Sequence, residues 1–141
     1  MDVSCASATG RFDIAEMAAE FPDTAKTLLL DRYLTDTPNA SARVFRAYRP
    51  TPPHYHVGSD EYLNVFCGRG TFWMEDAASK AEFAPGQLLF FRRGIVHALP
   101  DMFETPIVFL SIDTPRRDPK DIIFVNPADG TPDSFIQESG G

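Results

Sequence analysis

The chain has 141 residues, a length that suits one domain with one hydrophobic core. Hydrophobic residues make up 43% of it and charged residues 23%, which excludes a globally disordered protein. The formal net charge of −7 excludes a general nucleic-acid binder, because a polyanion would be repelled and no basic stripe overrides that repulsion.

No segment of the sequence predicts a membrane or secretion signal. The longest apolar run, 107–112, is far shorter than the roughly 20 residues that span a bilayer. The N-terminus lacks a basic region followed by an apolar stretch, so no signal peptide is visible. Two cysteines, Cys5 and Cys67, do not make a disulfide framework. We therefore expect a cytoplasmic protein with no membrane partner and no nucleic-acid partner.

The first predicted element is a short amphipathic helix after a loose N-terminal segment, 1–11. Asp13 followed by Glu16 is typical of a capping box, and Pro22 marks the end of the helix. Apolar residues then recur at the spacing of one helical face: Ile14, Met17, Ala18 and Phe21. We expect this helix to cover one end of the core.

From Thr27 onward the pattern changes to short apolar stretches separated by turn residues. Gly68-Arg69-Gly70 has the length of a hairpin turn, and Pro85-Gly86 and Arg92-Arg93-Gly94 also predict turns. Many short strands at such spacing are typical of an all-β sandwich or barrel. The predicted strands are 27–33, 42–48, 62–67, 71–74, 80–83, 87–91, 96–99 and 106–112.

The predicted barrel with its N-terminal helix occupies residues 12–115, and an acidic, proline-containing tail occupies 116–141. Within the tail, 122–125 is an apolar island and Phe135-Ile136 is a last apolar pair. Apolar side chains of this kind need a surface to cover them. We expect the tail to pack on the barrel or on a second subunit.

The three histidines of the chain fall in two blocks, His54-Tyr55-His56 and, far along the chain, His97. Alternate residues of a strand share a face, so His54 and His56 point the same way, about 6–7 Å apart at the backbone. Glu61 follows after four loop-forming residues, so the chain can turn back and present a carboxylate near them. A single buried histidine is more often a hydrogen-bonded core residue than a metal ligand. A His-x-His pair alone is also common on half-exposed strands, where it faces solvent. The complete set favours a metal site, and imidazole with carboxylate suits zinc, iron, manganese, nickel or copper.

The two blocks resemble the two motifs of the cupin superfamily. The first motif is a His-x-His pair, three or four residues, a glutamate, six residues and a glycine; here these are His54, His56, Glu61 and Gly68. The second is a glycine, five residues, Pro-x-Gly, two residues and a histidine; here it runs from Gly86 to His97. Two departures are Arg92 in place of the proline and Pro100-Asp101 where an asparagine is common. The motifs and the strands between them span 42–113, about half the chain.

The resemblance implies an all-β jelly-roll barrel, a double-stranded β-helix of the RmlC-like cupin type, with six or more antiparallel strands. It implies that His54, His56, Glu61 and His97 meet inside the barrel around one divalent transition-metal ion. It also implies a homodimer.

The surroundings of this centre follow from strand parity. Leu63 and Val65 share the face of Glu61, and Leu99 shares the face of His97, so we expect a largely apolar pocket filled by packing. An acidic substrate would need a guanidinium. The arginines nearest the two motifs are the candidates: Arg43, Arg46, Arg49, Arg92 and Arg93.

Three functions fit these observations. Four protein ligands leave one or two positions open on the ion, which is typical of a catalytic site and favours a metal-dependent dioxygenase, isomerase or lyase. Its substrate would be a small oxygenated molecule, and an acidic one if an arginine binds it. The alternatives are a binding or sensing module that captures a small ligand without chemistry, and a purely structural metal.

Overall fold

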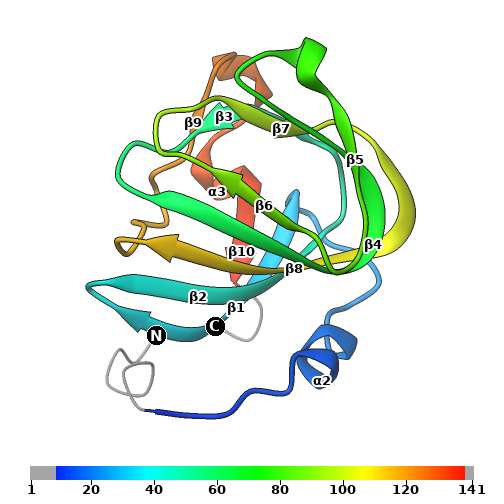
Figure 1. Ribbon diagram of the computed structural model, residues 1–141, viewed down its shortest axis with the longest axis vertical. Coiled ribbons are helices and arrows are strands. Elements are labelled where there is room, and N and C mark those ends of the chain that lie inside the picture. The colour runs from blue at the N-terminus through cyan, green and yellow to red at the C-terminus, as the bar shows by residue number, and fades with distance from the viewer. Residues whose placement is uncertain (1–8, 139–141) are drawn as a thin grey trace.

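The computed structural model describes residues 9–138, and its ribbon is drawn in Figure 1. Most of the predicted loose segment 1–11, together with Cys5, lies outside these residues; 9–11 have no regular structure. The strands are β1 (Leu29–Thr37), β2 (Ala40–Ala47), β3 (Thr51–Tyr55), β4 (Asp60–Met74), β5 (Ala81–Phe83), β6 (Leu88–Phe91), β7 (His97–Leu99), β8 (Met102–Thr114), β9 (Ile123–Phe124) and β10 (Ile136–Glu138). The helical segments are α2 (Ile14–Ala19), η1 (Ala77–Ser79), η2 (Pro127–Asp129) and α3 (Pro132–Phe135).

The strands form one strongly curled sheet in the order β10-β1-β2-β8-β4-β7-β3-β9, with β5 and β6 also paired to β4. In Figure 1, β3 and β7 lie across the barrel from β1 and β2, and β4 connects the two sides. The first half of β4 pairs with β8 and β6, whereas its last residues pair with β7. The predicted jelly-roll is thus the fold of the chain, and its strands form a curled half-barrel.

Alternation of side chains along much of each strand divides them between the interior and the outer surface. On β2, Phe45 faces the main core, whereas its neighbour Val44 belongs to a second cluster outside the sheet. Most of the core is aliphatic and aromatic, but one end of the interior is polar. That end gathers Asp31, Arg43, Glu61, Ser111 and Asp113, all buried. The interior of the barrel is therefore apolar over most of its length and charged at one end.

The predicted hairpin at Gly68-Arg69-Gly70 is wrong, because β4 continues through these residues to Met74. The register between β4 and β8 shifts around Cys67 and Arg69, which marks bulges rather than a turn. Gly68 has a φ of 91°, and a Cβ there would lie 2.6 Å from the carbonyl oxygen of Pro106. Glycine is thus needed to bend β4 from one side of the barrel to the other.

The helix α2 begins where the sequence predicts, because the side chain of Asp13 accepts a hydrogen bond of 3.0 Å from the backbone N–H of Glu16. Its apolar residues pack against a cluster around Phe21, Leu30 and Val44. This cluster lies on the outer face of β1, β2 and β8. The helix therefore covers that face, not an end of the core.

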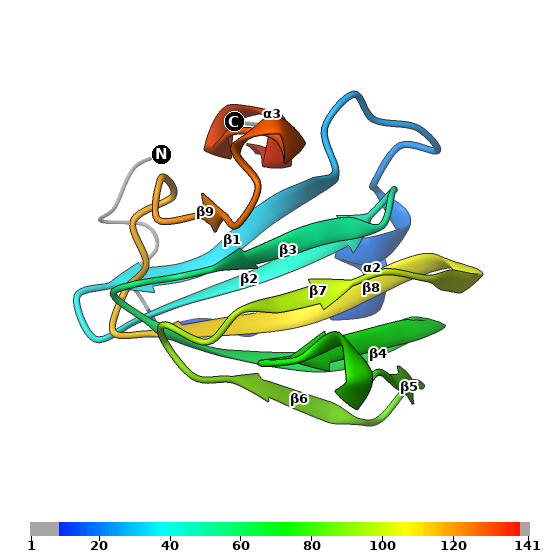
Figure 2. The same ribbon diagram turned by 90° about the horizontal axis from the view of Figure 1, so that it is seen from above.

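The segment after β8 folds back along the barrel. β9 pairs with β3, and β10 runs parallel to β1. Phe124 and Phe135 are buried in the main core. Figure 2 shows α3 against the side of the barrel formed by β1 and β9. Over residues 9–138, no helix has the length and apolar character needed to cross a membrane.

Candidate metal centre

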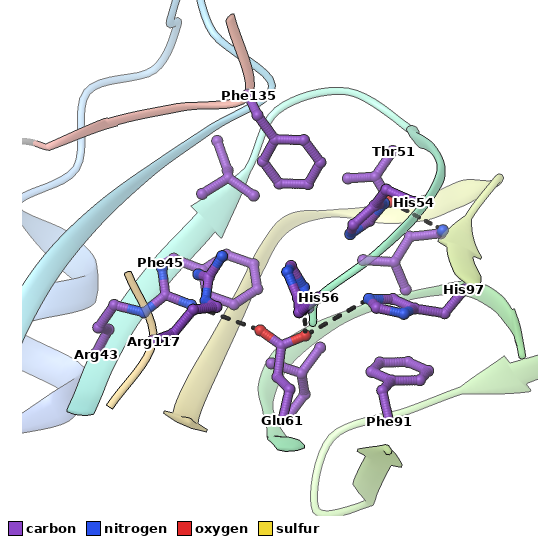
Figure 3. Close-up of a pocket in the computed structure, with 13 residues that line it drawn as sticks. Arg43, Phe45, Thr51, His54, His56, Glu61, Phe91, His97, Arg117 and Phe135 are labelled. Carbon is purple, nitrogen blue, oxygen red and sulfur yellow. Dashed lines mark hydrogen bonds and ion pairs between the residues drawn. The ribbon is translucent and has the colours of Figure 1, made fainter. Parts of the chain in front are cut away.

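Four side chains from three strands and one loop converge inside the barrel (Figure 3). His54 on β3 is the register partner of His97 on β7, so pairing of these strands sets the two imidazoles side by side. His56 follows the end of β3, and Glu61 lies near the start of β4. All four are buried, and nitrogen atoms of the three histidines lie within 4.8 Å of one another.

The orientation of each imidazole is fixed by a backbone carbonyl. The Nδ1 atoms of His54, His56 and His97 lie 2.7, 2.6 and 3.1 Å from the carbonyl oxygens of Pro52, Asp121 and Ile95. A carbonyl oxygen only accepts hydrogen bonds, so each Nδ1 must donate. The neutral ring then keeps an unprotonated Nε2 with its lone pair. This arrangement is the one that metal-binding histidines show in proteins.

The loop after β3 is held by the C-terminal segment. Both carboxylate oxygens of Asp121 accept hydrogen bonds of 2.8 Å, from the backbone N–H groups of Val57 and Gly58. The backbone carbonyl of Asp121 binds His56 itself. Asp121 therefore fixes both the ring of His56 and the loop that carries it.

Glu61 connects the histidines to a buried ionic cluster. Its Oε1 lies 3.6 Å from Nε2 of His56 and 3.6 Å from Nε2 of His97, while Oε2 lies 3.6 Å from Nη2 of Arg43. Burial alone would raise the pKa of Glu61, but the positive charges near it, from His56 when that ring is protonated and from the Arg117 guanidinium, hold the pKa well below its usual range. Glu61 is therefore a carboxylate at neutral pH.

Burial keeps His54 and His97 neutral. It lowers the pKa of His54 well below the ordinary value, and the neighbouring histidines add to the effect. Burial likewise lowers the pKa of His97 to about 4, although Glu61 opposes the shift. The ring of His97 stacks on Phe91 at 4.2 Å with the planes 9° apart.

This donor set fits a divalent transition-metal ion. Two donors bound to one ion at about 2.1 Å each are at most about 4 Å apart. The 3.6 Å distances from Glu61 to His56 and His97 meet this limit, and the three histidines, within 4.8 Å of one another, would close in slightly around an ion. Neutral imidazoles and one carboxylate suit zinc, iron, manganese, nickel or copper more than calcium or magnesium. The three histidines could therefore hold such an ion, and Glu61 lies beside two of them.

Comparisons with solved structures identify the architecture. An uncharacterised Klebsiella pneumoniae protein with a double-stranded β-helix domain superposes with a TM-score of 0.63 at 15% identity, over 77% of this chain and 92% of that one. An RmlC-like cupin with a double-stranded β-helix fold from Methanocaldococcus jannaschii superposes with a TM-score of 0.54 at 20% identity, over 69% and 88%. This chain has the cupin fold.

A further similar cupin-fold structure is a Ralstonia eutropha protein with a provisional assignment as a mannose-6-phosphate isomerase. It superposes with a TM-score of 0.64 at 18% identity, over 75% of this chain and 98% of that one. No protein-family model and no curated protein matches the sequence.

Of the five candidate arginines, only Arg43 reaches the interior of the cupin barrel. It is 2% exposed and forms ion pairs with Asp31 at 2.8 Å, Asp113 at 3.3 Å and Glu61 at 3.6 Å. The others are bound elsewhere: Arg46 to the carbonyl of Pro22, Arg49 to those of Ala25 and Thr27, and Arg93 to Asp60, while Arg92 is exposed.

The expected apolar pocket is only half right. Leu63, Leu99, Phe45 and Phe91 line it, but so do the guanidiniums of Arg43 and Arg117. Sequence reasoning missed Arg117, Phe135 and the positioning role of Asp121. All three lie beyond the cupin motifs, in the segment that folds back after β8. No local pattern marked Arg117 or Asp121, and Phe135 was marked only as part of an apolar pair that needs a surface to cover it.

Proposed function

We propose that this protein binds one divalent transition-metal ion through His54, His56, Glu61 and His97, and acts as an enzyme on a small oxygenated molecule. One observation supports this proposal above all. Three buried imidazoles, each fixed through Nδ1 by a backbone carbonyl, turn their other nitrogens toward one point beside a buried carboxylate. Histidines that serve only as core residues have no reason to converge in this way, since gathering neutral acceptors without a shared cation gains nothing.

An ion held by four protein ligands keeps one or two positions open and supplies Lewis acidity to a bound oxygen atom. The chain itself orients the ligand and restricts water. Phe45, Phe91 and Phe135 line the cavity beside the histidines, and the ring of Phe135 lies 4.7 Å from that of His54. Such a dry, aromatic wall strengthens electrostatic interactions inside the site.

Isomerisation, elimination and oxygenation all fit this arrangement. Apart from the four proposed ligands, the only charged side chains among the described lining residues are Arg43 and Arg117, so the wall offers no second carboxylate as a general base. The reaction would then depend on polarisation at the ion. The isomerase name of the Ralstonia protein makes isomerisation of a small hydroxy-carbonyl compound the first reaction to assay.

The alternative is a binding or sensing module without chemistry. The cavity beside the histidines has a volume of about 20 Å³, enough for about one water-sized group. A site that admits one coordinating group could serve capture alone. Prolonged incubation with a bound ligand under air, followed by mass spectrometry, separates the two, because an unchanged ligand favours capture and a converted ligand favours an enzyme.

Elemental analysis of protein purified without a histidine tag tests the metal centre. We expect close to one equivalent of a transition metal, lost in His54→Ala and strongly reduced in Glu61→Gln. Arg93→Gln, which alters an exposed ion pair with Asp60, is the control and should keep its metal. Equal metal content in the parent and in His54→Ala would refute the proposal. Circular dichroism after chelation distinguishes a structural ion, whose removal would unfold the barrel.

Two further expectations accompany this proposal. The homodimer implied by the resemblance stays a prediction, which multi-angle light scattering would measure directly. The cytoplasmic location likewise stays a prediction.

A further inference from the structure

Arg117 is a buried cation with unused hydrogen-bonding capacity. It follows β8 and is only 4% exposed. Its Nε lies 3.5 Å from Oδ1 of Asp113, an ion pair without a short hydrogen bond. Among residues 9–138, neither Nε nor Nη1 of Arg117 has a hydrogen-bond partner. A buried guanidinium whose donors stay unpaired is costly, so a bound group that satisfies them would be strongly favoured.

The neighbouring arginines are already committed to protein partners. Arg43 contacts three carboxylates and donates to the hydroxyl of Ser111 at 3.1 Å. Arg116 donates to Asp36 at 2.6 Å. Only Arg117 of these three combines burial with several unpaired donors, and its planar fork can grip a carboxylate through two parallel bonds.

Arg117 stands between two cavities. The inner cavity, of about 20 Å³, contains the histidines and Glu61. The outer cavity has a volume of about 190 Å³, enough for a small organic molecule. Arg43 and Arg117 line both, and Figure 3 shows the two arginines on one side of His56 and Glu61. The rest of the outer wall is Asp31, Tyr33, Pro119, Lys120, Pro132 and Asp133.

We propose that Arg117 is the docking residue for the carboxylate of a small monocarboxylic acid, whose oxygenated end faces the histidine cluster. This assignment rests on the proposed function for the identity of the inner site and for the charge balance around Arg117, whereas the burial and unpaired donors of Arg117 are independent of it. The ligand occupies the outer cavity and presents one group to the inner one, whose volume admits no more.

Charge within the barrel favours a single negative charge on the ligand. Around Arg117 lie the buried carboxylates of Asp31, Glu61 and Asp113, against two guanidiniums. A divalent ion turns this excess of one negative charge into an excess of one positive charge. One carboxylate on the ligand neutralises this excess positive charge, whereas a neutral sugar leaves it in place. A phosphate dianion would bring one negative charge too many and would be repelled by Asp31 and Asp133 in the outer wall.

Matched pairs of small probes test the inference by isothermal calorimetry and ligand-observed NMR. The probes are acetate, lactate and benzoate, each with its amide, which has a similar shape without the charge. We expect at least one acid to bind the parent protein about tenfold or more tightly than its amide. Arg117→Gln should lose that preference with unchanged metal content, Arg117→Lys should retain part of it, and Arg93→Gln should keep it fully.

A measurement on the parent protein covers the case in which the Arg117 variants do not fold. In ¹⁵N-labelled protein, the Nε–H signal of Arg117 should shift on addition of the acid and not of the amide. Equal binding of acid and amide, no binding of any acid, a preference that survives in folded Arg117→Gln, or tighter binding of inorganic phosphate would each overturn the inference.

The two proposals fail in different ways. Carboxylate binding that depends on Arg117 in a protein that never takes up metal would support the anion site and refute the metal centre. Metal bound through the histidines, with acid binding that does not change in the Arg117 variants, would support the metal centre and refute the anion site.

Discussion

Replacing Arg43 by methionine tests the buried ionic cluster that supports the site. The side chain is 2% exposed and is paired with Asp31, Asp113 and Glu61 at 2.8, 3.3 and 3.6 Å. Methionine fills a similar volume but leaves three buried carboxylates facing one another. Removal of one member of a buried ion pair costs about 3–5 kcal/mol, a large part of the 5–15 kcal/mol typical of a domain. A decrease of about 10–20 °C in Tm should follow.

The loss of stability in Arg43→Met must also depend on pH, and the structure determines whether it grows or shrinks as the pH falls. Burial raises the pKa of Asp113 in the parent protein, and the positive charge of Arg43 offsets only part of this increase. Without Arg43, the carboxylates of the folded variant bind protons more readily than those of the unfolded chain. Stability then increases as the pH falls, so the deficit of the variant should be largest near pH 8 and shrink toward pH 5.

Urea unfolding at several pH values, with chelator present so that metal binding does not contribute, measures both effects. Arg46→Met is the matched control, because Arg46 lies on the same strand but faces outward and donates to the carbonyl of Pro22. Arg46→Met should lower the free energy of unfolding by about 1 kcal/mol, with little pH dependence. A deficit for Arg43→Met below about 1 kcal/mol, or one equal at pH 5 and pH 8, would refute the reasoning.

Three other predictions concern the ligands and the curvature of β4. Asp121→Ala should raise the metal dissociation constant about 10–100-fold in a folded protein, since it frees the loop that carries His56; unchanged affinity in a competition titration would contradict this. In metal-free protein, the NMR titration midpoint of His97 should lie near 4, so this group destabilises the fold as pH falls from about 6.5 to 4; a midpoint above 6 would be inconsistent with burial. Gly68→Ala should cost about 2–4 kcal/mol in urea unfolding, because its Cβ would meet Ile107 and the φ is 91°; a cost near zero would show that the bulge relaxes freely.

Local patterns in the sequence were sufficient for most elements of the fold. Apolar stretches between turn residues placed most of the strands to within a few residues, although β3, β9 and β10 were not among the predicted ranges. Asp13 with Glu16 located the start of α2. The same patterns misread Gly68, because a positive-φ glycine in a bulge and one in a hairpin turn have the same local sequence. Only pairing with β8 decides between them.

The spacing of His54, His56, Glu61 and His97 determined by itself which side chains are candidates for a metal, since residue type and strand parity depend only on the chain. Tertiary structure decided what surrounds them. Arg117, Asp121 and Phe135 reach the site because the chain folds back after β8 and pairs β9 with β3. That return depends on contacts between residues some 65 positions apart, and no periodicity within a segment can report such contacts.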